Sequence, residues 1–403
     1  MGQGAEDAEP GPKPDREAAP DPLWEPPPGA AGRPLAGVRV LDVSRVLAGP
    51  YCAMLLADLG ATVVKVEGPR GDETRRWGPP FHNGTATYFY TANRNKQGLR
   101  LDLSVPSDRE RLQQLLRHAD VLVHNFTAHV LSRFHLTYDE VAAINPSCIH
   151  CGISGFGAED PDRPGFDVVA QAMGGLMSIT GSPGGPPTKV GVPISDLAAG
   201  LFSALAVSAC LRDRELRGRG AQVEVSLLDS VVALLSNQAM AHLAGGVEPT
   251  PLGNDHPQVA PYGLYLTRRG SIVIAAGTDG QFASLCRELG APELAADPRF
   301  ASNPARVSHL SELRLRLEAL LAEADADAWQ LRLERAGIPC GMVRSVAEVF
   351  AEVGARLVRT VDGIPQSMAP IRLNGEYLAP FLAPPAAGGP GQDPAPRLGV
   401  PPS

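Results

Sequence analysis

Short apolar runs alternate with amphipathic stretches over the first part of the chain. Runs rich in Val, Leu and Ile lie at 38–43, 61–67, 99–103, 121–126 and 149–156. Segments of helical character separate them, at 50–59, 106–118 and 137–144. Buried apolar strands that alternate with helices are typical of βαβ units in a parallel sheet, which places its sites at the carboxyl ends of the strands. We therefore expect an α/β domain here.

The pattern changes after about residue 222. A long helix is expected around 225–244, followed by a hairpin formed by 263–267 and 271–277. Further helical stretches lie near 280–289, 306–323 and 326–336. Helices grouped after a hairpin indicate a second, smaller α+β domain. The segment 337–345 predicts a turn and a strand that return the chain to the first domain.

The two ends of the chain have little apolar patterning. Residues 1–36 contain nine prolines and several acidic residues, and residues 380–403 are rich in proline and glycine. Such segments bury too little apolar surface to offset the entropy of ordering. We expect two disordered tails. The large domain then spans 37–222, the small domain 223–336, and 337–379 returns to the large one.

Charge and hydropathy argue against several classes of function. The net charge is −8 and the isoelectric point about 5.6, so nucleic acid or a membrane surface is not expected as the main partner. No apolar run approaches the roughly 18 to 20 residues of a membrane span, because Gly200 and Ser203 interrupt 197–211. The N-terminus resembles neither a signal nor a transit peptide. We expect a cytoplasmic protein, with a mitochondrial location as the alternative.

The six cysteines lie mostly in apolar surroundings, which favours reduced thiols over a disulfide scaffold. Cys148 and Cys151 form a CxxC pair around His150, but no second pair follows. The run that holds them is typical of a strand, in which these two thiols point to opposite faces. We expect no metal site.

Two common enzyme signatures are missing. Glu67 closes the second apolar run, as an acidic residue does in dinucleotide-binding folds. The first turn reads SRVLAGP, however, without the GxGxxG glycines that let a backbone approach a pyrophosphate. No GxSxG occurs either. These absences disfavour an NAD enzyme and a serine hydrolase.

Asp196 and Asp167 each precede a predicted helix. Either aspartate is explained as an N-cap that accepts backbone hydrogen bonds. The functional alternative for Asp196 is that a helix N-terminus keeps its carboxylate ionised and able to attack a thioester. The glycine-rich segment 174–187 between them is either a surface turn or a source of backbone donors for an oxyanion.

Basic residues follow or flank the predicted strand ends of the first domain. They are Arg45, Arg70, Arg75, Arg76, Arg94, Lys96, Arg133 and Arg163. Exposed arginines are commonly solvated surface, but an acidic protein that binds a phosphate-rich ligand needs such a cluster.

Several motifs in order resemble one family. They are LAGVRVLDVSRVLAGPYCAMLLADLGATVVKVE, GDETRRWGPPF, NRNKQGLRLDL, DVLVHNF, SGFG, PGFDVVAQAMGG, ISDLAAG and GIPCG, over about residues 35–365. This combination resembles the class III CoA-transferases, also called the CaiB/BaiF family, which contains the α-methylacyl-CoA racemases as well.

The resemblance implies a doubly wound parallel-sheet large domain built from both ends of the chain, a small α+β domain, and an interlocked homodimer. It implies coenzyme A (CoA) as co-substrate, with no permanently bound cofactor. The family's nucleophilic aspartate falls on Asp196, which carries first an acyl group and then CoA. Asp167 falls on an acidic residue that assists the site. Gly174, Gly175 and the loop 181–185 are candidate oxyanion donors.

The resemblance also implies CoA contacts. They fall on Arg45, Val46, Leu101, Leu103, Asn125, Phe126 and Arg133. Leu101 and Leu103 are expected beside the adenine and Arg133 at a phosphate. The arginine that often follows the acidic residue at position 67 is replaced by Gly68, so Arg70 is a candidate substitute.

Three departures from the family pattern narrow the function. Racemases carry a histidine where this chain has Phe166, so one of their two bases is missing. Leu47 and GNDHPQVAPYG replace a glutamine and a glycine-rich loop of formyl-CoA transferases. These two changes favour larger acids such as succinate, glutarate or hydroxymethylglutarate. The family's closing LGxHT segment appears only as PRLGVPPS. A racemase and a CoA-binding paralogue without catalysis remain the alternatives.

Overall fold

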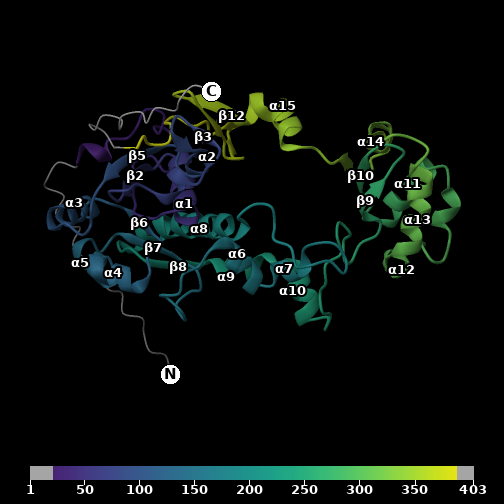
Figure 1. The fold of residues 1–403 in the computed structure, drawn as a ribbon, viewed down its shortest axis with the longest axis horizontal. Helices are drawn as coiled ribbons and strands as arrows, with labels where there is room; N and C mark the ends of the chain where they lie inside the picture. The colour runs from purple at the N-terminus through teal and green to yellow at the C-terminus, as the bar shows by residue number, and fades with distance from the viewer. Residues whose placement is uncertain (1–20, 388–403) are drawn as a thin grey trace. The chain divides into compact units, whose positions relative to one another are not determined.

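The computed structural model describes residues 21–387, which form two compact units (Figure 1). The described part of unit 1 comprises 21–176, 190–244 and 355–387, and unit 2 comprises 177–189 and 245–354. Unit 1 therefore takes residues from both ends of the chain, as the resemblance implies.

Unit 1 is built on a six-stranded sheet whose order is β5-β2-β1-β6-β7-β8. The strands are β1 (Arg39–Asp42), β2 (Thr62–Glu67), β5 (Lys96–Arg100), β6 (Val121–His124), β7 (Ile149–Ser154) and β8 (Gln222–Ser226). All five neighbouring pairs are parallel. The strand order reverses between β1 and β6, which makes the sheet doubly wound and places a ligand crevice at the carboxyl ends of these two strands.

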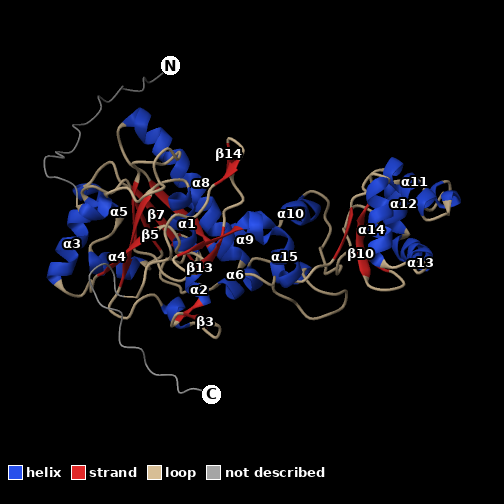
Figure 2. Cartoon of the chain, turned by 90° about the horizontal axis from the view of Figure 1, so that it is seen from above, coloured by secondary structure: helices blue, strands red, loops and turns tan. Residues whose placement is uncertain are grey.

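Helices cover both faces of this sheet (Figure 2). Helices α1 (Ala48–Asp58) and α8 (Ile194–Arg217) lie on one face, and α3 (Pro106–Leu116), α4 (Ala128–Phe134) and α5 (Tyr138–Ile144) on the other. Alternate residues of the central strands β1, β2 and β6 enter the two cores. Cys151 belongs to one core and Cys148 to the other, and all six cysteines are free, so the expected arrangement of the CxxC pair is confirmed.

Helix α8 corrects one expectation about length. Its 24 residues are long and apolar enough for a membrane span, despite Gly200 and Ser203. Helix α8 nevertheless packs one face against α1 and the sheet, with Ala199 and Val207 fully buried. Burial of this kind is typical of a core helix.

Unit 2 contains a small antiparallel sheet and a helical layer. Its strands are β9 (Tyr262–Leu266), β10 (Ser271–Ala275) and β11 (Cys340–Met342), and its helices α11 (Asp279–Glu288), α12 (Asn303–Ser308), α13 (Leu310–Leu321) and α14 (Ala326–Arg335). The predicted hairpin is confirmed as β9 and β10. The expected return to the large domain at 337 is wrong, because β11 pairs with β10.

The other domain boundary also differs from the prediction. Residues 222–226 form the edge strand β8, where Val223 and Val225 alternate with polar residues. Helices α9 (Leu227–Leu234) and α10 (Ser236–Leu243) follow it within unit 1. A single helix over 225–244 and a small domain from 223 were therefore wrong.

Several further elements lie within residues 21–387. They are 3₁₀ helices Pro22–Trp24, Glu73–Arg76 and Pro292–Ala295, helices α2 (Thr87–Tyr90), α6 (Asp167–Met173), α7 (Leu176–Ile179) and α15 (Val346–Leu357), and strands β3 (Phe81–His82), β4 (Thr85–Ala86), β12 (Val358–Val361), β13 (Ile364–Ser367), β14 (Arg372–Leu373) and β15 (Glu376–Tyr377).

The inner parts of both predicted tails are ordered. Trp24 is buried, and Arg33 donates a 2.7 Å hydrogen bond to the carbonyl of Ala379. Asn95 accepts hydrogen bonds from the backbone N–H groups of Phe381 and Leu382. Disorder was therefore the wrong expectation for 21–36 and 380–387. The rest of the predicted tails, 1–20 and 388–403, lies outside the described residues.

Candidate active site

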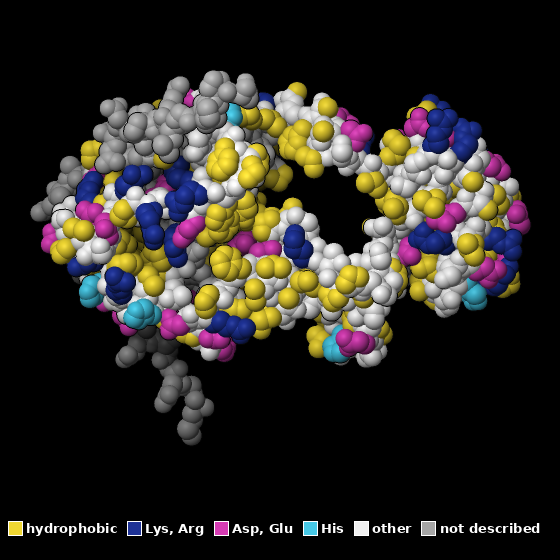
Figure 3. Space-filling view, in the orientation of Figure 1, with side chains coloured by type: hydrophobic (Ala, Val, Ile, Leu, Met, Phe, Trp, Pro, Cys, Tyr) yellow, Lys and Arg dark blue, Asp and Glu magenta, His cyan; other side chains and the backbone are white. Residues whose placement is uncertain are grey.

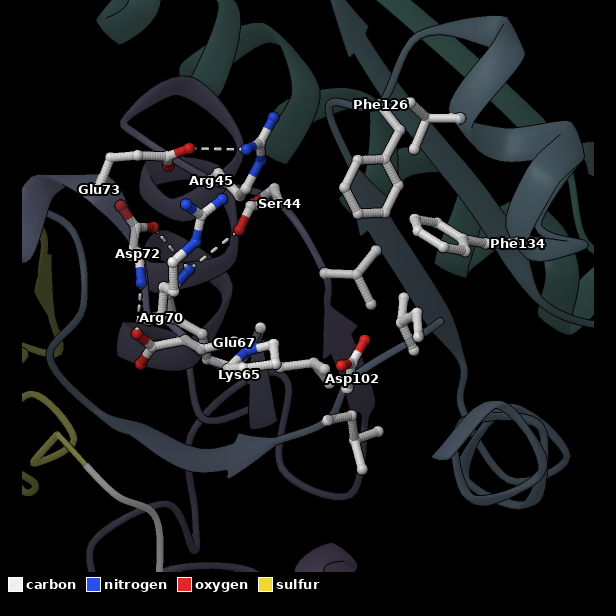
Figure 4. Close-up of a pocket in the computed structure, with 18 of the residues that line it drawn as sticks. Ser44, Arg45, Lys65, Glu67, Arg70, Asp72, Glu73, Asp102, Phe126 and Phe134 are labelled. Carbon is white, nitrogen blue, oxygen red and sulfur yellow. Dashed lines mark hydrogen bonds and ion pairs between the residues drawn. The ribbon is translucent and has the colours of Figure 1, made fainter. Parts of the chain in front are cut away.

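A cavity of about 590 Å³ opens at the carboxyl ends of β1, β2, β5 and β6 (Figure 4). Its lining includes six of the predicted CoA contacts, which are Arg45, Arg70, Leu101, Leu103, Phe126 and Arg133. Arg76 adds a fourth guanidinium and Phe134 a second aromatic ring. Basic groups beside an apolar wall suit a ligand that has both phosphates and a flat ring. That these residues bind CoA stays a prediction.

Asn125 and Val46, the other two predicted contacts, are held differently. The side-chain amide of Asn125 accepts a 2.9 Å hydrogen bond from the Arg45 N–H and donates a 2.7 Å bond to the Arg45 carbonyl. The N–H of Val46 donates to a carboxylate oxygen of Asp72 at 3.3 Å. Both contacts fix the backbone of the turn after β1, at the edge of the cavity.

The predicted basic cluster divides into exposed and buried members. Arg45 is about half exposed and pairs with Glu73 at 2.7 Å. Arg94 is buried in a two-bonded pair with Asp58, and Arg75 in a similar pair with Glu67. Arg75 and Arg94 therefore already have carboxylate partners and are poor candidates for a phosphate.

Lys96 is buried as well, although the sequence placed it among candidate anion-binding groups. Its ammonium donates to Asp42 at 2.8 Å, to the Pro50 carbonyl at 2.8 Å and to Asn93 at 3.0 Å. Burial lowers the pKa of Lys96 to about 8, although Asp42 opposes this shift. Lys96 holds β5 to the start of α1 inside unit 1.

Asp167 and Asp196 meet at the N-terminus of α8. One oxygen of Asp167 accepts hydrogen bonds from the Ser195 N–H at 2.9 Å and the Ser195 hydroxyl at 2.7 Å. The other accepts from Gln171 at 2.8 Å. Asp167 thus caps α8 from another segment, because the N-cap residue Pro193 supplies no side-chain acceptor. The idea that Asp196 caps its own helix was wrong, since it lies in the first turn.

The carboxyl group of Asp196 is partly buried and lies near the carboxylate of Asp167 and the backbone N–H of Ala48. Burial, together with the nearby charge of Asp167, raises the pKa of Asp196 to about 7, and a hydrogen bond from the backbone N–H of Ala48 opposes this shift. Ala48 is the first residue of α1. From the sequence, we expect the helix terminus to keep this carboxylate ionised. Burial and like charge outweigh that effect here.

Tyr88 of α2 completes this group and was missed in the sequence. Burial, together with the charges of Asp196 and Asp167, raises the pKa of its phenol to about 12. The ring of Trp77 packs edge-on against Tyr88, with centroids 5.3 Å apart. The segment TYFY at 87–90 belongs to no motif that would mark one of its two tyrosines as functional.

The predicted oxyanion donors lie in both units. Gly174 ends α6, and a Cβ at this position would lie 2.6 Å from the side chain of Val231. Gly175 follows at φ 82°. The loop 181–185 belongs to unit 2. Their role stays a prediction.

Comparisons with known proteins identify the family. The chain matches the family described as CoA-transferase family III over residues 35–399. It is 40% identical over 328 residues to a succinate–glutarate CoA-transferase of Agrobacterium fabrum, covering 79% of this chain and 82% of that protein. It is 42% identical over 323 residues to the succinyl-CoA:glutarate CoA-transferase of Mus musculus, covering 79% and 74% of the two chains.

A solved structure agrees with this result. A CaiB/BaiF family protein from Brucella suis has a TM-score of 0.78 and 40% sequence identity, covering 88% of this chain and 96% of that one. The chain therefore belongs to CoA-transferase family III. It is an enzyme that transfers CoA.

Proposed function

We propose that this enzyme moves CoA from an acyl-CoA donor to a carboxylic or dicarboxylic acid, with Asp196 as the nucleophile. The observation that carries the proposal is the position of Asp196 in the first turn of α8, which packs against Ala48 at the start of α1. The turn just before Ala48 carries Arg45, which lines the basic and apolar cavity. One helix terminus thus links the reacting group to the expected CoA site.

The reaction proceeds through two covalent states of Asp196. The carboxylate attacks the donor thioester, the C–S bond breaks, and an acyl anhydride and CoA thiolate form. The thiolate then attacks the Asp196 carbonyl, which releases the donor acid and leaves an aspartyl-CoA thioester. The acceptor carboxylate repeats these steps in reverse order and restores Asp196. No net proton is consumed, and the free energy of the thioester is retained while water is excluded.

The surroundings of Asp196 suit this chemistry above neutral pH. With a pKa of about 7, the side chain is mostly ionised at pH 8. The Ala48 N–H can donate to the oxyanion that forms when the Asp196 carbonyl is attacked. Asp167 fixes the first turn of α8 through Ser195. Its role is to position the nucleophile.

Succinyl-CoA as donor and a dicarboxylic acid such as glutarate as acceptor are the substrates we propose. The relatives from Agrobacterium fabrum and Mus musculus are named for succinate and glutarate. Another relative, from Acetobacter aceti, is named acetyl-CoA:oxalate CoA-transferase, with 38% identity over 350 residues. A matrix of acyl-CoA donors against free acids tests the choice. Transfer confined to monocarboxylic acids would contradict it.

A racemase, the first alternative, would need a second base beside Asp167. Phe166 is exposed at the start of α6 and offers no second base beside Asp167. Incubation of a branched acyl-CoA in deuterated water separates the two reactions. Deuterium at Cα without an acceptor acid would favour a racemase. For a paralogue without catalysis, CoA would raise the melting temperature while no acceptor supported transfer.

We also propose that the enzyme is a homodimer and that it is cytoplasmic. Large apolar side chains are exposed on α6, α8 and α9 of unit 1, and Figure 3 shows hydrophobic side chains gathered in this region. They are Val168, Val169, Met173, Leu201, Phe202, Leu205 and Val232. Exposed apolar patches commonly mark protein interfaces. Sedimentation velocity should give the mass of two chains, and the mass of one chain would contradict the dimer.

A further inference from the structure

The turn that joins β1 to α1 contains a strained residue. Val46 has φ 69°, in the left-handed region. Branching at Cβ makes that region unfavourable, and non-glycine residues found there are usually Asn or Asp. Among the described residues with positive φ, Val46 is the only β-branched one. Strain of this kind persists only where the surrounding structure enforces it, and it is concentrated at functional sites.

Two side chains enforce this conformation from opposite sides. Asn125, just after β6, holds both backbone groups of Arg45. Asp72, in the loop after β2, accepts the Val46 N–H through Oδ2. These contacts come from strands on the two sides of β1, so the turn is fixed at the point where the sheet reverses its strand order.

Asp72 is itself held by a buried lysine. The Lys65 ammonium lies 3.3 Å from Asp72 Oδ2 and donates a 3.0 Å hydrogen bond to the Ser44 carbonyl. Both charged side chains are fully buried. Lys65 therefore holds the turn directly at Ser44 and also orients the acceptor for Val46 (Figure 4).

The conformation of this turn determines the position of the N-terminus of α1. Leu47 is the N-cap and Ala48 the first helical residue of α1. Ala48 packs against Gly200, one turn after Asp196 in α8, and its backbone N–H lowers the pKa of Asp196. The Ala48 carbonyl lies only 2.8 Å from where a Cβ on Gly200 of α8 would stand. With α1 and α8 packed this closely, a shift of the turn moves the donor relative to the nucleophile.

We propose that Asp72, backed by Lys65, is a positioning residue for the transfer reaction: it holds Val46 in its left-handed conformation and so keeps the Ala48 N–H aimed at Asp196. This inference rests on the proposed role of Asp196 as nucleophile. A merely structural role is the alternative, because Asp72 Oδ1 also accepts from the Thr74 N–H and hydroxyl at the start of a 3₁₀ helix.

The substitution Asp72→Asn separates the two roles. An asparagine keeps Oδ1 for Thr74 but places an amide NH₂ where Val46 and Lys65 need an acceptor. Glycine adopts positive φ without strain, so Val46→Gly in the same chain should restore the turn without the clamp. Lys65→Met combined with Asp72→Asn removes both of these buried charges and guards against a folding defect caused by an ammonium left with only Asp42, 4.0 Å away, as an ion-pair partner. Asp120→Asn is the matched control, because it breaks a partly buried pair with Arg214 elsewhere in the unit.

We expect Asp72→Asn to lower kcat for CoA transfer by about 10- to 100-fold, because small displacements of reacting groups are costly in rate. Adding Val46→Gly should recover at least about tenfold. Both effects should recur in the Lys65→Met background. Asp120→Asn should lower the melting temperature and leave kcat within about twofold. No recovery by Val46→Gly would overturn the inference.

A second readout does not require turnover. The titratable groups near Asp196 are the carboxylate of Asp167 and the neutral phenol of Tyr88, which these variants retain, so loss of the Ala48 donor should raise the pKa of Asp196. Carboxyl ¹³C NMR, assigned with Asp196→Asn, measures this titration without substrate. A raised titration midpoint in Asp72→Asn supports the positioning role, whether or not transfer is observed. If no pair of acids supported transfer, that result would contradict the proposed function but not the positioning role. An unchanged midpoint in an active enzyme overturns the positioning role alone.

Discussion

At the scale of single residues, the two aspartates of the site have unequal roles. Asp167 is fully engaged, with hydrogen bonds from Ser195 and Gln171. Asp196 receives the Ala48 N–H and keeps a proton to about pH 7. The sequence offered both as caps or as catalytic groups. The hydrogen bonds identify Asp167 as the cap of α8, and Asp196 is the group that we propose as the nucleophile.

The charge of Asp167 should set the pH dependence of the enzyme. In the folded protein Asp196 ionises near pH 7, so kcat/KM should rise with pH through that value. Asp167→Asn removes a like charge and keeps an acceptor for Ser195. The pKa of Asp196 should then fall, and the acid limb of a pH–rate profile should move to lower pH by about one unit. A limb that stays in place or moves upward would contradict this assignment.

Glu73 should weaken CoA binding by competing for Arg45. The two side chains form an exposed ion pair at the cavity, where such pairs contribute on the order of 0–1 kcal/mol. Glu73→Gln should therefore lower the KM for acyl-CoA about two- to fivefold at low salt, with kcat unchanged. Glu215→Gln, which breaks an exposed pair with Arg212 on α8, controls for net charge. Equal effects of both substitutions would show that Arg45 is not involved.

At the scale of elements, the contact between α1 and α8 determines the geometry of the site. Gly200 lies in α8 where a Cβ would meet the Ala48 carbonyl at 2.8 Å and the Tyr51 ring at 3.0 Å. Gly200→Ala should gain some helix propensity but lose more through this clash, for a net destabilisation of about 1–3 kcal/mol and reduced transfer activity. Thermal unfolding and steady-state rates measure both.

Gly354→Ala in α15 is the matched control, because no atom lies within 4 Å of its added Cβ. It should stabilise the chain by about 0.5–1 kcal/mol through helix propensity alone. If Gly200→Ala behaved like Gly354→Ala, the close packing of α1 on α8 would be refuted.

Strand and helix periodicity predicted much of unit 1, because β-branched runs such as 61–67 are buried on both faces and leave little ambiguity. The edge strand β8 was missed, because its alternating valines lead directly into a helix. The capping of α8 by Asp167 could not be predicted from local sequence either, because Asp167 and Ser195 are 28 residues apart. Lys96 was a candidate for binding an anion, but in the structure it is buried and paired with Asp42. The sequence around Lys96 contains no pattern that indicates this pair.

At the scale of the whole chain, both described end segments are part of unit 1. Asn95 attaches the C-terminal segment to unit 1, because its side chain accepts hydrogen bonds from Phe381 and Leu382 and donates one to Asp58. Composition predicted disorder for this segment. The segment is nevertheless ordered, because its backbone is hydrogen-bonded to Asn95, almost 290 residues earlier in the chain.

Asn95→Ala should therefore loosen the C-terminal segment. It removes three hydrogen bonds and places alanine at φ 62°, so we expect a loss of about 2–4 kcal/mol and faster proteolysis near residue 380. Asn83→Ala, at φ 48° in an exposed turn, controls for backbone strain alone. Equal proteolysis of the two variants would contradict the attachment.

The central claim is that Asp196 carries first the acyl group and then CoA. The most direct measurement is the mass of the peptide that contains Asp196 after the enzyme is mixed with succinyl-CoA and quenched with hydroxylamine. We predict that Asp196 gains a hydroxamate, that Asp196→Asn shows no such adduct, and that this variant has lost transfer. Normal exchange between free acids and their thioesters in an Asp196→Ala enzyme would contradict the account.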